Sequence, residues 1–287
     1  MLKKFFISAI SLAAVLIVVL MVSSCGKKPG NVPKKLPSSP PNPSAAARKP
    51  AKMPPPKPAP TPMPAPGKEV RVVIIIDDMG NDMKALDEVL ALPGPVVVAV
   101  LPLTSHSAET AIRAESAGRE VLLHLPMQPK GDLRGLGPGA LMSGMGPEEI
   151  KENLNKDLAS VPGAEGVNNH MGSLLTEDPA AMDALMTELK ARNLFFIDSL
   201  TTSGSVACRM ASEEGVQSAS RRVFLDDFPD EAAIKAQLER LVKLAKKYGT
   251  AIAIGHPRPS TLKVLKEEIP GLSAHGVRVA KISEALK

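Results

Sequence analysis

The sequence VVIIIDDMG at residues 72–80 joins five consecutive apolar residues to a pair of aspartates and a glycine. A short run rich in Val and Ile is typical of a strand that is buried on both faces, as in a parallel sheet. Two adjacent carboxylates at the end of such a strand are costly to bury unless they are paired or bind a metal ion. We therefore interpret Asp77 and Asp78 as part of a functional site, although they could also cap the helix that follows.

Seven further apolar runs follow this one, at residues 96–101, 121–123, 166–167, 194–197, 223–225, 251–254 and 277–280. Helical patterns separate them, beginning near residues 81, 107, 147, 179, 230 and 260. Strands that alternate with helices predict βαβ units and a parallel sheet covered by helices. We expect an α/β fold, a (β/α) barrel with seven or eight mostly parallel strands. An open doubly wound sheet is the alternative.

Polar side chains gather where the apolar runs end. In both architectures the carboxyl ends of the strands carry the functional groups. Carboxylate and imidazole groups are common ligands of zinc and similar ions, so we expect a metal site built from several strands. The residues at these ends are Asp77, Asp78, Pro102, His124, Asn168, Asn169, His170, Asp198, Ser199, Asp226, Asp227 and His256.

Each of these residues also has a structural explanation. His124 could be a core histidine bonded to the backbone, His170 a turn residue, and His256 a loop residue before Pro257. Asp226 and Asp227 precede Phe228 and Pro229, a pattern that favours turn and cap chemistry. His106 and His275 lie away from the strand ends, and we expect them at the surface.

The first 67 residues differ from the rest in composition. Residues 1–25 contain Lys3, Lys4, an apolar run at residues 5–22, and small residues before Cys25. A positive start followed by an apolar run predicts an export signal. The residues before Cys25 resemble the lipobox of bacterial lipoproteins, which implies a lipidated anchor. An uncleaved membrane anchor and simple secretion are the alternatives, and each places the domain outside the cytoplasm, on the periplasmic side of the cell envelope.

Residues 26–67 hold fifteen of the 28 prolines, which predicts an extended Pro-rich linker before a folded domain at residues 68–287. Residues 1–67 carry ten Lys or Arg and no Asp or Glu, which leaves 25 basic and 30 acidic residues in the remainder. A domain with a negative balance does not favour a phosphate backbone, so we expect no nucleic-acid partner. The membrane partner would be reached through the N-terminal anchor.

Five motifs of the domain, taken in order, resemble the divergent branch of the polysaccharide deacetylases, which are (β/α)-barrel carbohydrate esterases. They are IIIDDMG at residues 74–80, LHLPMQP at 123–129, NNHMGS at 168–173, FIDS at 196–199 and GHPRP at 255–259. The resemblance covers nearly the whole of residues 70–287. It implies a barrel fold, a divalent metal such as zinc, and a carbohydrate or peptidoglycan-type substrate.

The resemblance also implies a role for individual residues. Asp77 matches the catalytic base, Asp78 a metal ligand, and His256 the late histidine that acts as acid. His124 matches the first of two metal histidines on the third strand, but Gln128 stands at the position of the second. His170, at the end of the next strand, would then complete the metal site with Asp78 and His124.

These expectations point to a metal-dependent hydrolase that removes acetyl groups from an N-acetylated envelope or exported polysaccharide. A non-catalytic, membrane-tethered module that binds cell-wall glycan or an envelope protein is the alternative. Gln128 and the scarcity of aromatic residues, which usually stack on sugars, favour that alternative. A hydrolase of another ester class would use the same ligands.

Overall fold

The computed structural model describes residues 69–286. The expected export segment 1–25 and the expected linker 26–67 lie outside the described residues, as do the two terminal residues of the expected domain at 68–287. Between residues 69 and 286, none of the helices has both the length and the apolar composition that crossing a bilayer requires.

The described residues form nine strands, eight α-helices and two 3₁₀ helices. The strands are β1 (Val70–Met79), β2 (Val97–Val100), β3 (Val121–Met127), β4 (Gly166–Met171), β5 (Phe195–Asp198), β6 (Ser218–Ser220), β7 (Val223–Phe224), β8 (Thr250–Gly255) and β9 (Val277–Val279). The α-helices are α1 (Met83–Leu90), α2 (Ser107–Ser116), α3 (Pro147–Ser160), α4 (Pro179–Ala191), α5 (Ala207–Glu214), α6 (Glu231–Tyr248), α7 (Pro259–Glu268) and α8 (Ile282–Ala285). The 3₁₀ helices are η1 (Leu175–Glu177) and η2 (Ile269–His275).

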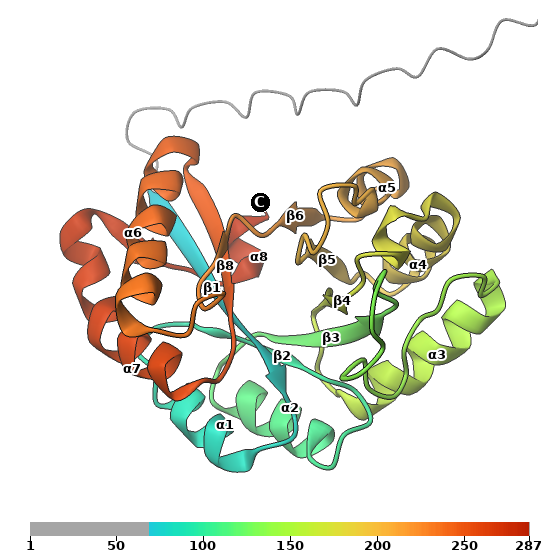
Figure 1. The fold of residues 1–287 in the computed structure, drawn as a ribbon, viewed down its shortest axis with the longest axis horizontal. Helices are drawn as coiled ribbons and strands as arrows, with labels where there is room; N and C mark the ends of the chain where they lie inside the picture. The colour runs from blue at the N-terminus through green and yellow to red at the C-terminus, as the bar shows by residue number, and fades with distance from the viewer. Residues whose placement is uncertain (1–68, 287) are drawn as a thin grey trace, which may run out of the picture. The chain divides into compact units, whose positions relative to one another are not determined.

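The strands form one sheet in the order β6-β5-β4-β3-β2-β1-β8-β7, and β9 pairs with the first residues of β1. All the strand pairs in the described residues are parallel. Figure 1 shows the helices from α6 through α1, α2, α3 and α4 to α5 in an arc around the outside of the strands. The alternation of apolar runs with helical patterns is therefore confirmed as a parallel α/β fold.

The two edges of the sheet meet at a seam. β6 and β7 stand at opposite ends of the strand order, yet only Arg221 and Arg222 separate them in the chain. The Arg221 amide donates to the Asp198 carbonyl of β5 at 2.9 Å, and the Arg222 amide donates to the Ile252 carbonyl of β8 at 2.8 Å. Because consecutive Cα atoms are only about 3.8 Å apart, the sheet must curl until its edges meet. The predicted (β/α) barrel is confirmed in preference to an open doubly wound sheet.

Alternate residues of each strand belong to two different cores. The outer core lies between the strands and helices, and includes Ile74, Leu123 and Val167. The inner core fills the barrel, and apart from the short α8 its buried residues come from strands: Val73, Ile75, Val97, Ala99, Leu122, Phe195, Ile197, Ile252, Ile254 and Ile282. Side chains alternate along a strand with a period of two. The inner set therefore continues at the carboxyl ends of the strands to Asp77, His124, Asn168, His170 and His256.

A candidate metal centre and active site

The two adjacent aspartates face the same site because the end of β1 is irregular. Asp77 continues the inner face of β1 and is only 3% exposed. Asp78 would point outward in a regular strand, but it has a φ of 59°, and the pairing of β1 with β2 shifts between Ile76 and Met79. Left-handed backbone is unusual for a residue other than glycine and often marks a functional site. This turn brings the carboxylate of Asp78 to the histidines of the neighbouring strands.

The following helix does not need either aspartate as its cap. The side chain of Asp82 accepts hydrogen bonds from the amides of Lys84 at 2.8 Å and Ala85 at 3.2 Å, at the start of α1. A carboxylate in this position satisfies the free amides of the first helical turn. Asp77 and Asp78 therefore remain available for the site.

Three side chains from three strands converge at the carboxyl end of the barrel: Asp78, His124 and His170. Oδ1 of Asp78 lies 3.3 Å from Nε2 of His124 and 3.1 Å from Nδ1 of His170. The two ring nitrogens are 3.1 Å apart. This is the set that the sequence and the resemblance together nominated as metal ligands, and the fold brings all three within mutual reach.

The hydrogen bonds behind the two histidines decide which nitrogen carries the proton. Nδ1 of His124 lies 3.0 Å from Oδ1 of Asn168, and Nε2 of His170 lies 3.0 Å from the carbonyl oxygen of Gly135. Both partners are acceptors, so Nδ1 of His124 and Nε2 of His170 must carry the protons that are donated. The remaining nitrogens, Nε2 of His124 and Nδ1 of His170, face each other and Asp78, and they are the atoms that could offer lone pairs to a cation.

These three atoms fit a divalent cation. Oδ1 of Asp78 is buried and has no hydrogen-bond partner among the described residues. Ligands about 2.1 Å from a tetrahedral zinc ion lie about 3.4 Å from one another, close to the separations found here. Burial opposes protonation of His124, but Asp77 and Asp78 outweigh it and raise the His124 pKa to about 9. The site thus attracts positive charge, and a proton on Nε2 competes with a cation.

Asn168 joins the Asp78–His124–His170 cluster to Asp77. It is fully buried, and its Nδ2 donates to Oδ1 of Asp77 at 2.8 Å while its Oδ1 accepts from His124. Burial raises the pKa of Asp77. Burial acts in the same direction on Asp78, but the imidazoles of His124 and His170 beside it outweigh burial and lower the Asp78 pKa. Adjacent carboxylates with opposite pKa shifts are typical of a division between a proton acceptor and a ligand.

His256 lies beside Asp78 and is held by Asp226. Its Nε2 is 3.7 Å from Oδ2 of Asp78, and its Nδ1 is 2.9 Å from Oδ1 of Asp226. Burial opposes protonation of His256, but the Asp226 carboxylate outweighs it and raises the His256 pKa. Oδ2 of Asp226 accepts from the His256 amide and from Thr261, both at 2.8 Å.

The interpretation of Asp226 as turn and cap chemistry was wrong. The residue is fully buried, and it orients a ring in the site instead of capping a helix. The helix that follows, α6, takes Asp230 as its cap, since Oδ1 of Asp230 accepts from the Ala233 amide at 2.9 Å. The position of Asp226 directly after the apolar run at residues 223–225 was the signal that could have identified it.

Other polar residues of the strand ends support loops. Oδ1 of Asp198 accepts from the Leu200 amide and Oδ2 from Ser205, whereas Asn169 fixes the backbone of Met171 and Ser199. Gln128 does not join the Asp78–His124–His170 cluster, because its Oε1 accepts from the Ser143 amide at 2.7 Å. His275 is exposed in η2, and His106 precedes α2.

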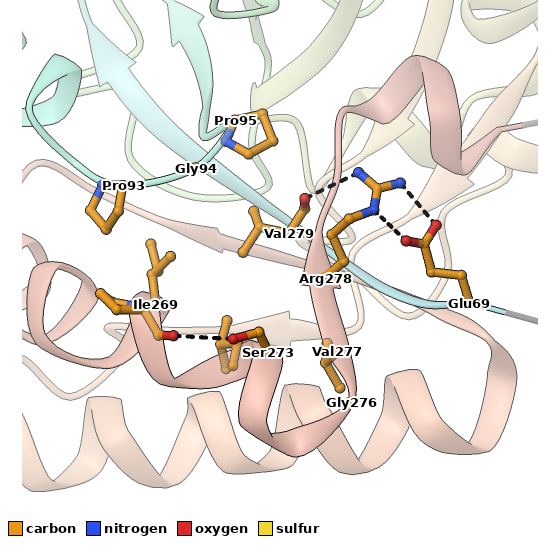
Figure 2. A pocket seen from close by; sticks show the side chains of 12 residues that line it. Glu69, Pro93, Gly94, Pro95, Ile269, Ser273, Gly276, Val277, Arg278 and Val279 are labelled. Carbon is orange, nitrogen blue, oxygen red and sulfur yellow. Dashed lines mark hydrogen bonds and ion pairs between the residues drawn. The ribbon is translucent and has the colours of Figure 1, made fainter.

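A cavity of about 490 Å³ lies away from these groups (Figure 2). Its walls come from residues before β1 and β2 and from η2 and β9, and are largely apolar. The charged side chains of this wall, Glu69 and Arg278, are paired at 2.7 Å. The cavity wall contains none of Asp78, His124 and His170.

A parallel (β/α) barrel with an aspartate pair and histidines at the carboxyl ends of its strands defines a carbohydrate-esterase-like deacetylase fold. The comparison with protein families agrees, because the divergent polysaccharide deacetylase family matches residues 74–286. The chain belongs to this family, and the resemblance drawn from the five sequence motifs is confirmed.

Two bacterial proteins, both described as uncharacterized, are similar in sequence to this chain. A protein of Haemophilus influenzae is 40% identical over 202 residues, which cover 70% of this chain and 72% of that protein. YibQ of Escherichia coli K12 is 41% identical over 202 residues, and the match covers 70% of this chain but only 63% of YibQ.

A solved structure also shares the fold. The crystal structure of an uncharacterized protein from Agrobacterium tumefaciens C58 superimposes with a TM-score of 0.73 at 21% identity. The superposition covers 77% of this chain and 91% of that one. At this level of identity the match supports the fold, and function must be argued from the site.

Proposed function

We propose that this protein is a metal-dependent hydrolase that deacetylates an N-acetylated polysaccharide of the cell envelope. The observation that carries the proposal is the convergence of Asp78, His124 and His170, with Asp77 and His256 beside them. Membership of the divergent polysaccharide deacetylase family supports a carbohydrate substrate. Zinc is the proposed ion, because one carboxylate and two imidazoles form a common zinc ligand set.

Asp78, His124 and His170 would hold the ion. When bound, such a cation polarises a carbonyl and lowers the pKa of water to about 7. Asn168 and Gly135 keep the two imidazoles in the tautomers that metal binding needs, because each fixes the proton on the nitrogen that faces away. The protein's contribution is therefore an orientation of ligands that exists before substrate arrives.

Asp77 is the proposed general base. Its carboxylate lies beside the ligands, with Oδ2 3.5 Å from Nε2 of His124, and burial raises its pKa. A base with a raised pKa takes a proton from water more readily than an ordinary aspartate does. Asn168 donates to Oδ1 of Asp77, which directs the other oxygen toward the cluster.

His256 is the proposed general acid. Asp226 holds its Nδ1–H, so that Nε2 faces the site and can deliver a proton to the leaving amine. Because the Asp226 carboxylate raises the His256 pKa, the ring carries its proton over a wider pH range. A general acid and a general base beside the same proposed ion meet the needs of amide hydrolysis.

The proposed location is the periplasmic side of the cell envelope, with the domain anchored to a membrane through residues 1–25. This part of the proposal rests on the sequence of the N-terminus. Labelling of Cys25 with a radioactive fatty acid, and its loss in Cys25→Ala, would test the lipid anchor.

Acetate release tests the enzymatic proposal. The full-length protein, loaded with zinc, should release acetate from N-acetylated chitooligosaccharides or from peptidoglycan fragments. Asp77→Asn should abolish release without changing the zinc content, whereas Asp82→Asn, which alters the nearby helix cap, should retain activity. If the zinc-loaded wild type releases acetate from neither substrate, the tethered binding module becomes the better description.

A further inference from the structure

The loop between β3 and α3, residues 128–146, is rich in glycine and passes beside the Asp78–His124–His170 cluster. It contains Gly131, Gly135, Gly137, Gly139, Gly144 and Gly146. Gly135 and Gly137 have φ angles of 83° and 82°, in the left-handed region that glycine adopts without steric cost. Residues with a Cβ would be strained in the backbone conformation that the loop adopts at these two positions.

This loop is docked on the barrel. Leu136 and Leu141 are buried, and the amide of Leu141 donates to the Pro126 carbonyl of β3 at 2.9 Å. The side chain of Gln128 accepts from the Ser143 amide, which ties the far end of the loop to the end of β3. Buried leucines and hydrogen bonds to β3 therefore fix where the loop lies.

One atom of the docked loop reaches the cluster. The carbonyl oxygen of Gly135 lies 3.0 Å from Nε2 of His170, and it can only accept a hydrogen bond. It therefore holds the proton on Nε2 and leaves the lone pair of Nδ1 directed toward Asp78, 3.1 Å away. Partners of this kind typically change metal affinity 10- to 100-fold.

We propose that the β3–α3 loop is a working part of the metal centre, with the Gly135 carbonyl as the group that positions His170. Loop docking and cation binding then stabilise each other by the same factor, because coupling between two equilibria is reciprocal. This inference rests on the proposed function. It adds that the docking of the loop sets how tightly the proposed site binds its cation.

The position of Gln128 is consistent with this arrangement. The resemblance places a second metal histidine there, whereas the third ligand here comes from His170 on β4. Gln128 instead anchors the loop whose carbonyl supports His170. The presence of Gln128 in place of a second metal histidine and the use of His170 as the third proposed ligand are thus connected through one loop.

A pair of glycine variants tests the proposal. A Cβ at Gly135 would meet only the end of the Met171 side chain at 3.7 Å, and a Cβ at Gly118, which follows α2 outside the loop and has a φ of 73°, would meet nothing within 4 Å. Both variants therefore strain the backbone alike without a clash, but relief of strain at Gly135 rotates the peptide that contacts His170. The zinc Kd of the full-length protein, measured by competition with a chromophoric chelator, should rise at least about tenfold in Gly135→Ala and stay within about threefold in Gly118→Ala.

A second variant and hydrogen exchange cover the case in which Gly135→Ala does not fold. Gln128→Leu removes the acceptor for Ser143 and should also weaken zinc binding. In the wild type, zinc should slow amide exchange in residues 131–141. Equal zinc affinities in the two glycine variants, or loop exchange that zinc leaves unchanged, would overturn the inference. Failure of the wild type to bind zinc would instead overturn the proposed function.

Discussion

The imidazole of His256 donates its Nδ1–H to Oδ1 of Asp226 across 2.9 Å. Asp226 is fully buried and makes two further contacts, with the His256 amide and Thr261, so its position is fixed on one side of the ring. The pair joins the end of β7 to the end of β8. It gives His256 both an orientation and a raised pKa, which are the two properties that a general acid requires.

Replacing Asp226 by Asn should lower kcat by about 10²- to 10⁴-fold, the usual contribution of a positioned acid. The alkaline limb of the pH–rate profile should also move to lower pH, because the carboxylate that raises the His256 pKa is lost. Zinc content should not change. Asp227→Asn alters the exposed neighbour and is the matched control. Identical profiles for the two variants would exclude the proposed role of Asp226.

Asn168 should affect metal binding and proton transfer separately. Asn168→Leu removes both of its hydrogen bonds and should raise the zinc Kd about 10- to 100-fold. Asn168→Asp keeps an acceptor for His124 but sets a second carboxylate against Asp77. It should retain zinc affinity, while its activity falls and the acid limb of the pH–rate profile moves to higher pH. A loss of zinc from Asn168→Asp equal to that from Asn168→Leu would contradict this division.

The metal ligands can be tested by zinc content alone. Asp78→Ala and His170→Ala should each weaken zinc binding by more than about 100-fold, because each removes a ligand outright and not merely an outer partner. His275→Ala is the control, since that ring is exposed and outside the cluster. Atomic absorption on purified, dialysed protein provides the measurement. Full zinc occupancy in both ligand variants would remove the proposed site.

The burial of Asp157 predicts that the stability of the fold depends on pH. This effect does not involve the candidate active site. The residue is fully buried on α3, neither carboxylate oxygen has a hydrogen-bond partner among the described residues, and burial raises its pKa to about 8. In the unfolded chain this proton leaves near pH 4, whereas the folded protein retains it until about pH 8. The free energy of unfolding should therefore fall as pH rises from 4 to 8 and then level off.

Asp157→Asn removes this titration and keeps the shape of the side chain. The variant should match the wild type near pH 4 and exceed it at pH 8 by on the order of 2 kcal/mol, because it no longer buries an unpaired charge. Thermal unfolding of both full-length proteins, followed by circular dichroism across this range, provides the comparison. Parallel pH profiles for the two proteins would show that Asp157 is not the source of the dependence.

Much of the fold could be predicted because the barrel is built from local patterns. A buried parallel strand must be apolar along its length, so VVIIIDDMG and the runs like it identify strands without any knowledge of contacts. Parallel strands also place their carboxyl ends at one rim, which is why Asp77, His124, His170 and His256 could be grouped from sequence alone. The short β6 and β7 could not be separated in this way, because their split is visible only at the seam between Arg221 and Arg222.

The sequence by itself determined the strand–helix alternation, the family, and which carboxylate and imidazole groups stand at the strand ends. Only the tertiary structure decided how those groups meet. The left-handed turn at Asp78, the burial of Asp226 beneath His256, and the contact of Gly135 with His170 each join residues distant in sequence or break the period of a strand. Local periodicity carries no information about such contacts, since they depend on how the sheet closes and where the loops come to rest.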